Sequence, residues 1–498
     1  MNVESLGTNS KLALTNNKLS VEISQDDTEE TITNYIKSGI FNFGLDLFFG
    51  SVQQNLEVIE RLKDAAYKES KLLDFSIPFS IYLKLSPRLQ YTGKFKRNKI
   101  SLNLKLNKLV VLTTNREYAS RSCHSLIYVN AKFLMPDVKK CDIIRLGKFI
   151  QLQVVETNQI SDQVTCKVIV PGIVKPRMLA RFPKHIEMAH LKISSEELED
   201  ITFAIGTNIN VIISHTPGSP EYCNELHGTL SELKCKHFYL FTRLTFSCVE
   251  SLEDAKWISN GYDGFLIDCS DNFPEDEIIK LSPGARVLME RSYYKRKPIF
   301  LLGCWSKFVH PSDYCHAFQL PDKFILPCKT DFLRLFEAVF QKLSKSEILE
   351  KDIYKKPHSS SSLLARAVLA ASFDFQADAI IVCSSIGEQA IKISHFRPEA
   401  LILSVTTLDS VVNYTSMYHN ILMLAFDMKN DTDLTQKEET HQKLIHGVRY
   451  ALLKKFVYYS STVILVFQKH MQFGSADKFA VIKIDNDYGK TINNVILN

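Results

Sequence analysis

The chain has 498 residues, of which 45% are hydrophobic and 23% are charged. These values are typical of a globular protein, and they exclude global disorder, a collagen-like repeat and a chain that is one long coiled coil. At about 150 residues per domain the length favours three domains and is compatible with two or four. The net charge of +5 is small for this length, so it indicates neither a nucleic-acid partner nor a membrane partner.

Targeting signals and cysteine chemistry are also constrained by the sequence. Residues 1–20 are polar and lack the apolar core of a secretory signal. The apolar stretch at residues 456–467 is too short to span a bilayer. Eleven cysteines are spread along the chain without a CxxC pair, which argues against zinc ribbons and thioredoxin-type chemistry. Such cysteines are typical of reduced thiols and predict a cytoplasmic location.

The first elements alternate between helix and strand. Residues 1–28 are polar and rich in Ser, Thr and Asn, which predicts a loose N-terminal arm. The spacing of apolar residues then predicts, in order, a helix over 31–39, a strand over 41–47, a helix over 52–65 and a strand over 75–85. This alternation is typical of a parallel sheet built from βαβ units.

The alternation stops at Gly93 and resumes after Pro183. Between these residues the apolar runs are short and rich in Val and Ile, which predicts a small all-β domain. Ser195 and an acidic first turn predict a helix over 195–205. Further strands are expected at 211–214, 238–242, 264–268, 299–303 and 323–327. One βα domain interrupted by an all-β insertion accounts for this order.

A basic, serine-rich stretch follows at residues 345–362 and contains the run KKPHSSSS. Its composition predicts a solvated linker. A second α/β unit comes after it. Its expected elements are a helix over 363–375, a strand over 379–383, a helix over 385–396 and strands over 401–405, 421–425 and 463–467.

One long run in this unit, ARAVLAASFDFQADAIIVCSSIGEQAIKISHFRPEALILSVTT at residues 365–407, carries a family likeness. It resembles the C-terminal domain of pyruvate kinase, including the FRP turn between a helix and the next strand. Residues 37–50 and 195–268 resemble the first unit and the middle of that family's barrel. Thr92-Gly93 and residues 127–129 resemble the start of its inserted domain, so the likeness preserves the domain order.

The resemblance implies an α/β fold with three parts. These are a (β/α)8 barrel, a small β-barrel domain inserted into it, and a C-terminal α/β domain. The expected ranges are 1–28 for the arm, 29–93 and 184–344 for the two parts of the barrel, 94–183 for the inserted domain, 345–359 for the linker and 360–498 for the C-terminal domain.

The resemblance also implies a chemistry, the transfer of a phosphoryl group between phosphoenolpyruvate and ADP with Mg²⁺ and K⁺. Such catalysis depends on positioned cations. Thr245 stands at the position of the family's catalytic Lys, and Ser247 at that of a Mg²⁺-binding Glu. Asp271 matches the second Mg²⁺ ligand, or is an ordinary carboxylate at the start of a helix. Arg243 lies on the same strand face as Thr245, either as a substitute cation or as a barrel arginine paired with a carboxylate.

Further substitutions fall on the positions that the resemblance assigns to phosphate and K⁺. Gly44 replaces an Arg that contacts phosphate. Asp46 and Phe48 replace an Asn and a Ser that help to hold K⁺. Asp46 either still holds a cation or belongs to a packed barrel loop. Lys84 replaces an Asp of the same K⁺ site. Its ammonium either substitutes for K⁺ as an internal cation or marks simple decay of the site, so the retention of both metal ions stays open.

The resemblance places an effector loop at Ser384 and Ser385. Its hydroxyls could hold a phosphate at the following helix N-terminus, but Glu388 replaces an Arg there and would repel it. The alternative is a plain connection between a strand and a helix.

Three functions remain on these observations. The first is a pyruvate-kinase-like protein that is inactive or strongly impaired and is kept for assembly. The second is an active phosphotransferase with a rewired site built on Arg243, Asp271 and Lys84. The third is a metabolite-binding regulatory subunit. The expected partners are copies of the same chain in a dimer or tetramer, or an intact pyruvate kinase in a mixed oligomer. Phosphoenolpyruvate or a nucleotide is the expected small ligand.

Overall fold

The computed structural model describes residues 17–48, 51–86, 90–93, 95–96, 101–119, 121–130, 138–147, 149–158, 163–175, 178, 180–182, 193–233, 237–245, 252–268, 281–302, 320–326, 360–426, 435–468 and 476–497. The chain forms two compact units. One comprises residues 1–86 and 195–498, and the other comprises residues 87–194.

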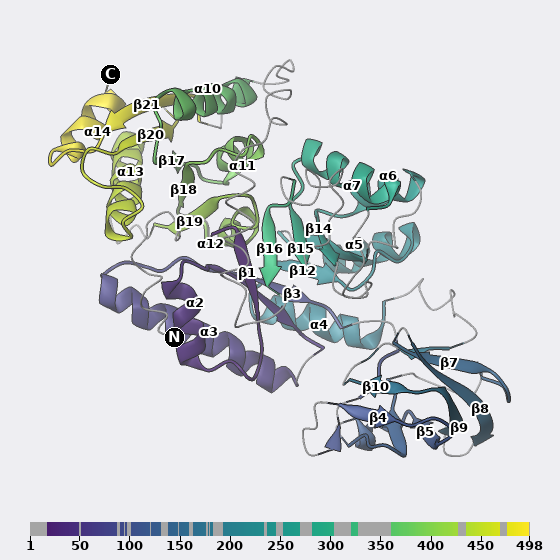
Figure 1. The fold of residues 1–498 in the computed structure, drawn as a ribbon. Coiled ribbons are helices and arrows are strands. Elements are labelled where there is room, and N and C mark those ends of the chain that lie inside the picture. Colours follow the sequence, from purple (N-terminus) through teal and green to yellow (C-terminus); the bar gives the residue numbers. More distant parts are fainter. Residues whose placement is uncertain are drawn as a thin grey trace. The chain divides into compact units, whose positions relative to one another are not determined.

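The first unit contains a closed barrel of eight parallel strands (Figure 1). In chain order they are β1 (Leu19–Ile23), β2 (Asn42–Asp46), β3 (Ser80–Lys84), β12 (Val211–Ser214), β13 (Tyr239–Thr245), β14 (Gly264–Asp268), β15 (Ile299–Leu302) and β16 (Lys323–Leu326). The expected barrel and its α/β class are therefore confirmed. The arm expected over residues 1–28 is wrong at β1, where Leu19, Val21 and Ile23 are buried.

Six helices are described between the barrel strands: α2 (Glu29–Lys37), α3 (Val52–Leu73), α4 (Ser195–Gly206), α5 (Pro220–Glu232), α6 (Leu252–Gly261) and α7 (Pro283–Tyr294). The sequence defines their starts. In α3, Ser51 and Gln54 form a reciprocal capping box, which satisfies two backbone N–H groups that have no partner within the helix. In α5 and α7 a serine cap precedes a proline in the first turn, where proline costs no hydrogen bond.

The barrel interior is filled by one buried apolar cluster. It comprises Tyr82, Val211, Ile213, Phe241, Leu266, Phe300, Leu302, Ile325 and Met417. Met417 comes from the C-terminal domain, so that domain helps to close one end of the barrel. The Asn42 amide contacts the Met417 sulfur at 3.1 Å. Tyr239 of β13 stacks on Tyr414 with ring centroids 3.5 Å apart.

The C-terminal domain is a five-stranded sheet with helices on both faces. Its elements are α10 (Ser360–Asp374), β17 (Ala379–Cys383), α11 (Glu388–His395), β18 (Leu401–Thr406), α12 (Asp409–Thr415), β19 (Ile421–Ala425), α13 (Gln436–Leu453), β20 (Thr462–Phe467), β21 (Lys478–Lys483) and α14 (Tyr488–Leu497). The strand order is β19-β18-β17-β20-β21, with β21 antiparallel. Gly447 lets α13 lie close to β17, since a Cβ there would stand 2.6 Å from Ile381.

In its described residues the second unit consists of strands and a short 3-10 helix at Arg116–Tyr118. It has a six-stranded sheet in the order β11-β7-β8-β9-β5-β6 and a two-stranded sheet of β10 and β4. The strands are β4 (Leu102–Leu104), β5 (Leu109–Thr113), β6 (Leu126–Tyr128), β7 (Ile143–Leu146), β8 (Ile150–Asn158), β9 (Gln163–Val170), β10 (Gly172–Val174) and β11 (Ala180–Arg181). Alternate residues of these strands form its own apolar core, as expected of half-buried strands.

Candidate functional site

Charged side chains gather where the barrel strands end. We define the rim cluster as Glu22, Asp46, Lys84, Arg243 and Asp268. Asp46, Lys84 and Asp268 are the last residues of β2, β3 and β14. Because the eight strands are parallel, their carboxyl ends meet at one rim, which is where barrels of this kind carry their chemistry.

Lys84 is held between two carboxylates of this cluster. Its Nζ lies 2.8 Å from Glu22 Oε1 and 3.2 Å from Asp46 Oδ2, and only 10% of its side chain is exposed. Burial alone would lower the pKa of Lys84, but the attraction of Glu22 and Asp46 outweighs it and raises the pKa above its ordinary value. The ammonium is therefore fixed in place and stays protonated at neutral pH.

Arg243 is engaged in the same way by Asp268. Arg243 Nε donates to Asp268 Oδ2 at 2.7 Å, and Nη2 contacts the same oxygen. The Asp268 side chain is fully buried. Arg243 Nη1 also lies 3.2 Å from the His215 ring. Burial, Arg243 and Lys84 together hold the pKa of His215 well below its usual range, so this imidazole is neutral.

The Tyr82 ring lies inside the barrel, close to Glu22 and Asp46 of the rim cluster. A Cβ added to Gly44 would stand 2.4 Å from Tyr82 Cζ, which is far inside van der Waals contact. The Tyr82 hydroxyl lies 3.3 Å from Ser20 Oγ. Burial and the nearby Glu22 raise the pKa of Tyr82 well above its usual value, so the phenol remains neutral. Position 44 consequently has no room for the arginine that the resemblance implies.

Asp200 of α4 adds another carboxylate near the rim. It accepts a hydrogen bond from the Ser86 backbone N–H at 2.6 Å. Burial raises the pKa of Asp200 to about 6, with Asp46 and Glu197 adding to the rise and the hydrogen bonds from Ser86 opposing it. This carboxyl therefore changes its charge in mildly acidic solution.

The structure brings together three of the residues predicted from the sequence, namely Asp46, Lys84 and Arg243. Thr245 ends β13, paired in register with Asp268, but its side chain lies outside the described residues. Ser247 and Asp271 also lie outside them. The roles proposed for these six residues remain predictions.

Ser384 and Ser385 lie apart from the rim cluster, between β17 and α11 of the C-terminal domain. Thr406 Oγ1 donates to the Ser385 carbonyl at 2.9 Å. Glu388 in the first turn of α11 pairs with Lys392. This places a carboxylate at the helix N-terminus, where a bound phosphate would also sit. An effector role for the two serines also remains a prediction.

The residues at the K⁺ position do not fit a K⁺ ion. The Lys84 ammonium lies on the Asp46 carboxylate, and the neighbouring positions Phe48 and Leu85 carry apolar side chains. Across the described part of the chain, no group of three or more His, Cys, Asp and Glu side chains is arranged to hold a metal ion. The two positions implied for Mg²⁺, Ser247 and Asp271, lie outside the described part of the chain.

Three residues of the site, Glu22, Asp268 and His215, were not predicted from the sequence. Glu22 lies in the stretch assigned to an arm, although the alternation of Leu19, Val21 and Ile23 is a signal for a strand with Glu22 on its other face. Asp268 and His215 carry no motif of their own. His215 lies in the loop that follows β12 and contacts Arg243 there.

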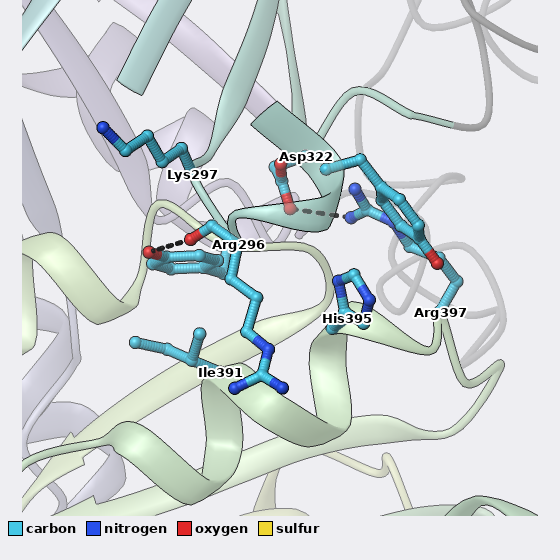
Figure 2. A pocket seen from close by; sticks show the side chains of 8 residues that line it. Arg296, Lys297, Asp322, Ile391, His395 and Arg397 are labelled. Carbon is cyan, nitrogen blue, oxygen red and sulfur yellow. Dashed lines mark hydrogen bonds and ion pairs between the residues drawn. The ribbon is translucent and has the colours of Figure 1, made fainter. Parts of the chain in front are cut away.

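A pocket lies at the opposite ends of the strands, beside the C-terminal domain. It encloses about 230 Å³ of space, part of it open to solvent, and its lining includes Arg296, Lys297, Asp322, His395 and Arg397. Figure 2 shows the Arg397 guanidinium directed at Asp322. Since Arg296 and Asp322 lie just before β15 and β16, this pocket is remote from the rim cluster.

Two further observations concern membranes and thiols. No helix within the described ranges combines the length and apolar character needed to cross a bilayer. The five described cysteines, Cys123, Cys141, Cys166, Cys223 and Cys383, are free thiols.

Comparison with known proteins gives a consistent assignment. The family description "Pyruvate kinase, barrel domain" matches residues 20–234, and "Pyruvate kinase, alpha/beta domain" matches residues 362–482. A pyruvate kinase of Clostridium acetobutylicum is 20% identical over 82% of this chain and 88% of its own length. A pyruvate kinase of Dictyostelium discoideum is 21% identical over 78% of this chain and 79% of its own length. Pyruvate kinase 1 of Trypanosoma brucei brucei is 20% identical over 91% of this chain and 92% of its own length. With both family domains matched in order around a closed eight-stranded barrel, the chain belongs to the pyruvate kinase family.

Proposed function

We propose that this protein is a pyruvate kinase relative in which phosphoryl transfer is lost or strongly impaired. One observation carries the proposal. Both basic side chains of the rim cluster, Lys84 and Arg243, are already paired with carboxylates of the same chain.

Phosphoryl transfer leaves little covalent chemistry for a protein to perform, so its rate comes from cations aimed at the transferred oxygens. A cation that is fixed by two carboxylates has little attraction left for an incoming phosphate. Tyr82 over Gly44 adds to this effect, because it fills the place of a phosphate-binding arginine. Thr245 and Ser247 in place of Lys and Glu complete the proposed loss.

Within this proposal Lys84 serves as an internal cation. Its ammonium supplies the positive charge that the carboxylates of the rim require, and it does so without a bound K⁺. The raised pKa of Lys84 supports this role, because the charge then persists at every pH at which the protein is expected to work.

The retained folds support a role in assembly. We propose that the chain forms a dimer or tetramer in the cytoplasm, or a mixed oligomer with an intact pyruvate kinase. The C-terminal domain matches its family over residues 362–482, although its effector loop has lost the arginine. Light scattering at micromolar concentration, and co-purification after co-expression with an intact pyruvate kinase, test the two forms of assembly.

An active enzyme with a rewired site is the second candidate. It is favoured by the position of Lys84, since an ammonium on Asp46 supplies charge where the resemblance places a cation. Isothermal titration separates the two candidates. The first predicts no measurable heat from phosphoenolpyruvate, or from ADP with Mg²⁺, at concentrations that saturate an intact pyruvate kinase. Saturable binding of both ligands would instead support the second.

A further inference from the structure

Lys323 begins β16 and is completely buried. It shares its strand face with Ile325, which belongs to the cluster inside the barrel. The lysine side chain therefore enters the barrel floor, at the end opposite the rim cluster. Its Nζ donates to the Asn17 carbonyl at 2.7 Å.

This amine lies where the barrel meets the C-terminal domain. Lys323 lines a small pocket whose other lining side chains are uncharged, among them Phe41, Asn42, Phe79 and Ser80 from the barrel and Ser416, Ile421 and Leu422 from the C-terminal domain. Two amide atoms in this layer, Asn17 Nδ2 and Asn42 Oδ1, are buried without a hydrogen-bond partner. An ammonium enclosed in this way is poorly solvated.

The charges around the amine do not compensate for this burial. The nearby carboxylate is Asp322, and it already accepts from Arg397 Nη1 at 2.7 Å and from the His419 N–H at 2.9 Å. Lys18 on the β1 side repels a proton on Lys323. On the C-terminal side Arg397 is cationic, while burial and the surrounding cations keep the pKa of His419 well below its usual range. The attraction of Asp322 therefore offsets only part of the cost of burying the Lys323 ammonium.

We propose that Lys323 is a proton-sensitive latch at this joint, closed while its amine is neutral and weakened when the amine takes up a proton. Burial is the main cause that lowers the pKa of Lys323 to about 7, with Lys18 adding to the effect and Asp322 opposing it. The unfolded chain holds this proton up to about pH 10.5. The folded state therefore gains stability as the pH rises from about 7 toward 10.5. The proposal is independent of any activity at the rim cluster.

Counting protons during unfolding tests the latch directly. Calorimetric unfolding of the full chain at pH 8.5, in two buffers of different ionisation enthalpy, gives the number of protons taken up. We expect the wild type to take up about one more proton than Lys323→Met. Lys63→Met, at an exposed lysine of α3, is the matched control and should behave as the wild type. Equal proton uptake by the wild type and Lys323→Met would overturn the proposal.

The wild type also gives a test that does not depend on a variant folding. Between pH 7 and pH 9 the lowered pKa of Lys323 should by itself make the unfolding constant of the wild type fall about 50-fold. Locally, the hydrogen-exchange protection factor of the His419 amide should rise over the same range. Lys323→Arg, which cannot lose its charge, should keep this protection low and independent of pH. A His419 protection factor that stays constant in the wild type would contradict the latch.

Discussion

The Tyr82 ring lies directly against Gly44, so that a Cβ on residue 44 would stand 2.4 Å from Tyr82 Cζ. Gly44 and Tyr82 are paired in register on neighbouring strands β2 and β3. The Tyr82 ring can therefore pack in this place only because residue 44 is a glycine and has no side chain. This arrangement occupies space that the family resemblance assigns to a phosphate-binding arginine.

Gly44→Ala tests this packing. The added methyl group should lower the free energy of unfolding by about 1–3 kcal/mol, as expected for an overpacked core. Gly228→Ala in the exposed part of α5 is the control, since nothing lies within 4 Å of its Cβ, and it should stabilise the protein by about 0.5–1 kcal/mol. Urea denaturation measures both. In a Tyr82→Val background the cost of Gly44→Ala should largely disappear, and an unchanged cost would show that the ring is not the obstacle.

Lys84→Met tests the internal cation. Removing the ammonium leaves Glu22 and Asp46 without their partner, which should cost about 3–5 kcal/mol. KCl should then raise the melting temperature of this variant more than choline chloride does at the same ionic strength. In the wild type the two salts should act alike. Because the pKa of Lys84 is raised, its contribution is complete below about pH 10.5 and is lost only as the pH rises through its higher folded value. A K⁺-specific stabilisation of the wild type would exclude the internal cation.

The Arg243–Asp268 pair predicts a strong coupling between the two residues. Arg243→Met leaves the buried Asp268 carboxylate uncompensated and should destabilise the protein by about 3–5 kcal/mol. The double variant Arg243→Met/Asp268→Leu should recover most of this loss, because no charge remains buried. Lys63→Met, which disrupts an exposed pair with Glu60, should change stability by less than about 1 kcal/mol. Additive effects of the two substitutions at 243 and 268 would mean that the pair is not formed in solution.

Asp200 predicts a dependence of stability on pH. Its folded pKa is raised from 3.8 to about 6, so the folded state binds a proton more tightly than the unfolded state. The contribution of Asp200 therefore falls as the pH rises from about 4 to 6. Asp200→Asn should be more stable than the wild type at pH 7.5 by about 1–3 kcal/mol, and this difference should vanish near pH 4. Urea denaturation at the two pH values measures it, and an identical difference at both would contradict the raised pKa.

The sequence predicted the fold well where apolar residues follow a regular spacing. The strands at Val211–Ser214 and Gly264–Asp268 have the expected bounds, because a barrel strand buried on both faces is a continuous apolar run. β1 was missed for the opposite reason. Only alternate residues of Leu19–Ile23 are apolar, and the stretch is flanked by polar residues, so it resembled part of an arm.

The candidate site was less predictable, since it depends on which strands are neighbours. Lys84 and Asp46 were both identified as charged positions, and their pairing follows from the register of β2 and β3. Glu22 was not predicted as a site residue, because the strand β1 that carries it was not predicted. The ion pair of Arg243 with Asp268 joins residues from adjacent barrel strands, and neither a motif nor a periodicity links two such residues in the sequence.

The most direct test of the account is the turnover of phosphoenolpyruvate and ADP to pyruvate by the purified full-length chain, with Mg²⁺ and K⁺ both present. An intact pyruvate kinase measured in parallel is the control for the coupled assay. Removal of single charge-stabilising groups often costs roughly 10²–10³-fold in rate, and several are absent or neutralised here. We therefore expect a rate at least about 10³-fold below that of the control. A rate within about tenfold of the control would contradict the proposed loss of phosphoryl transfer.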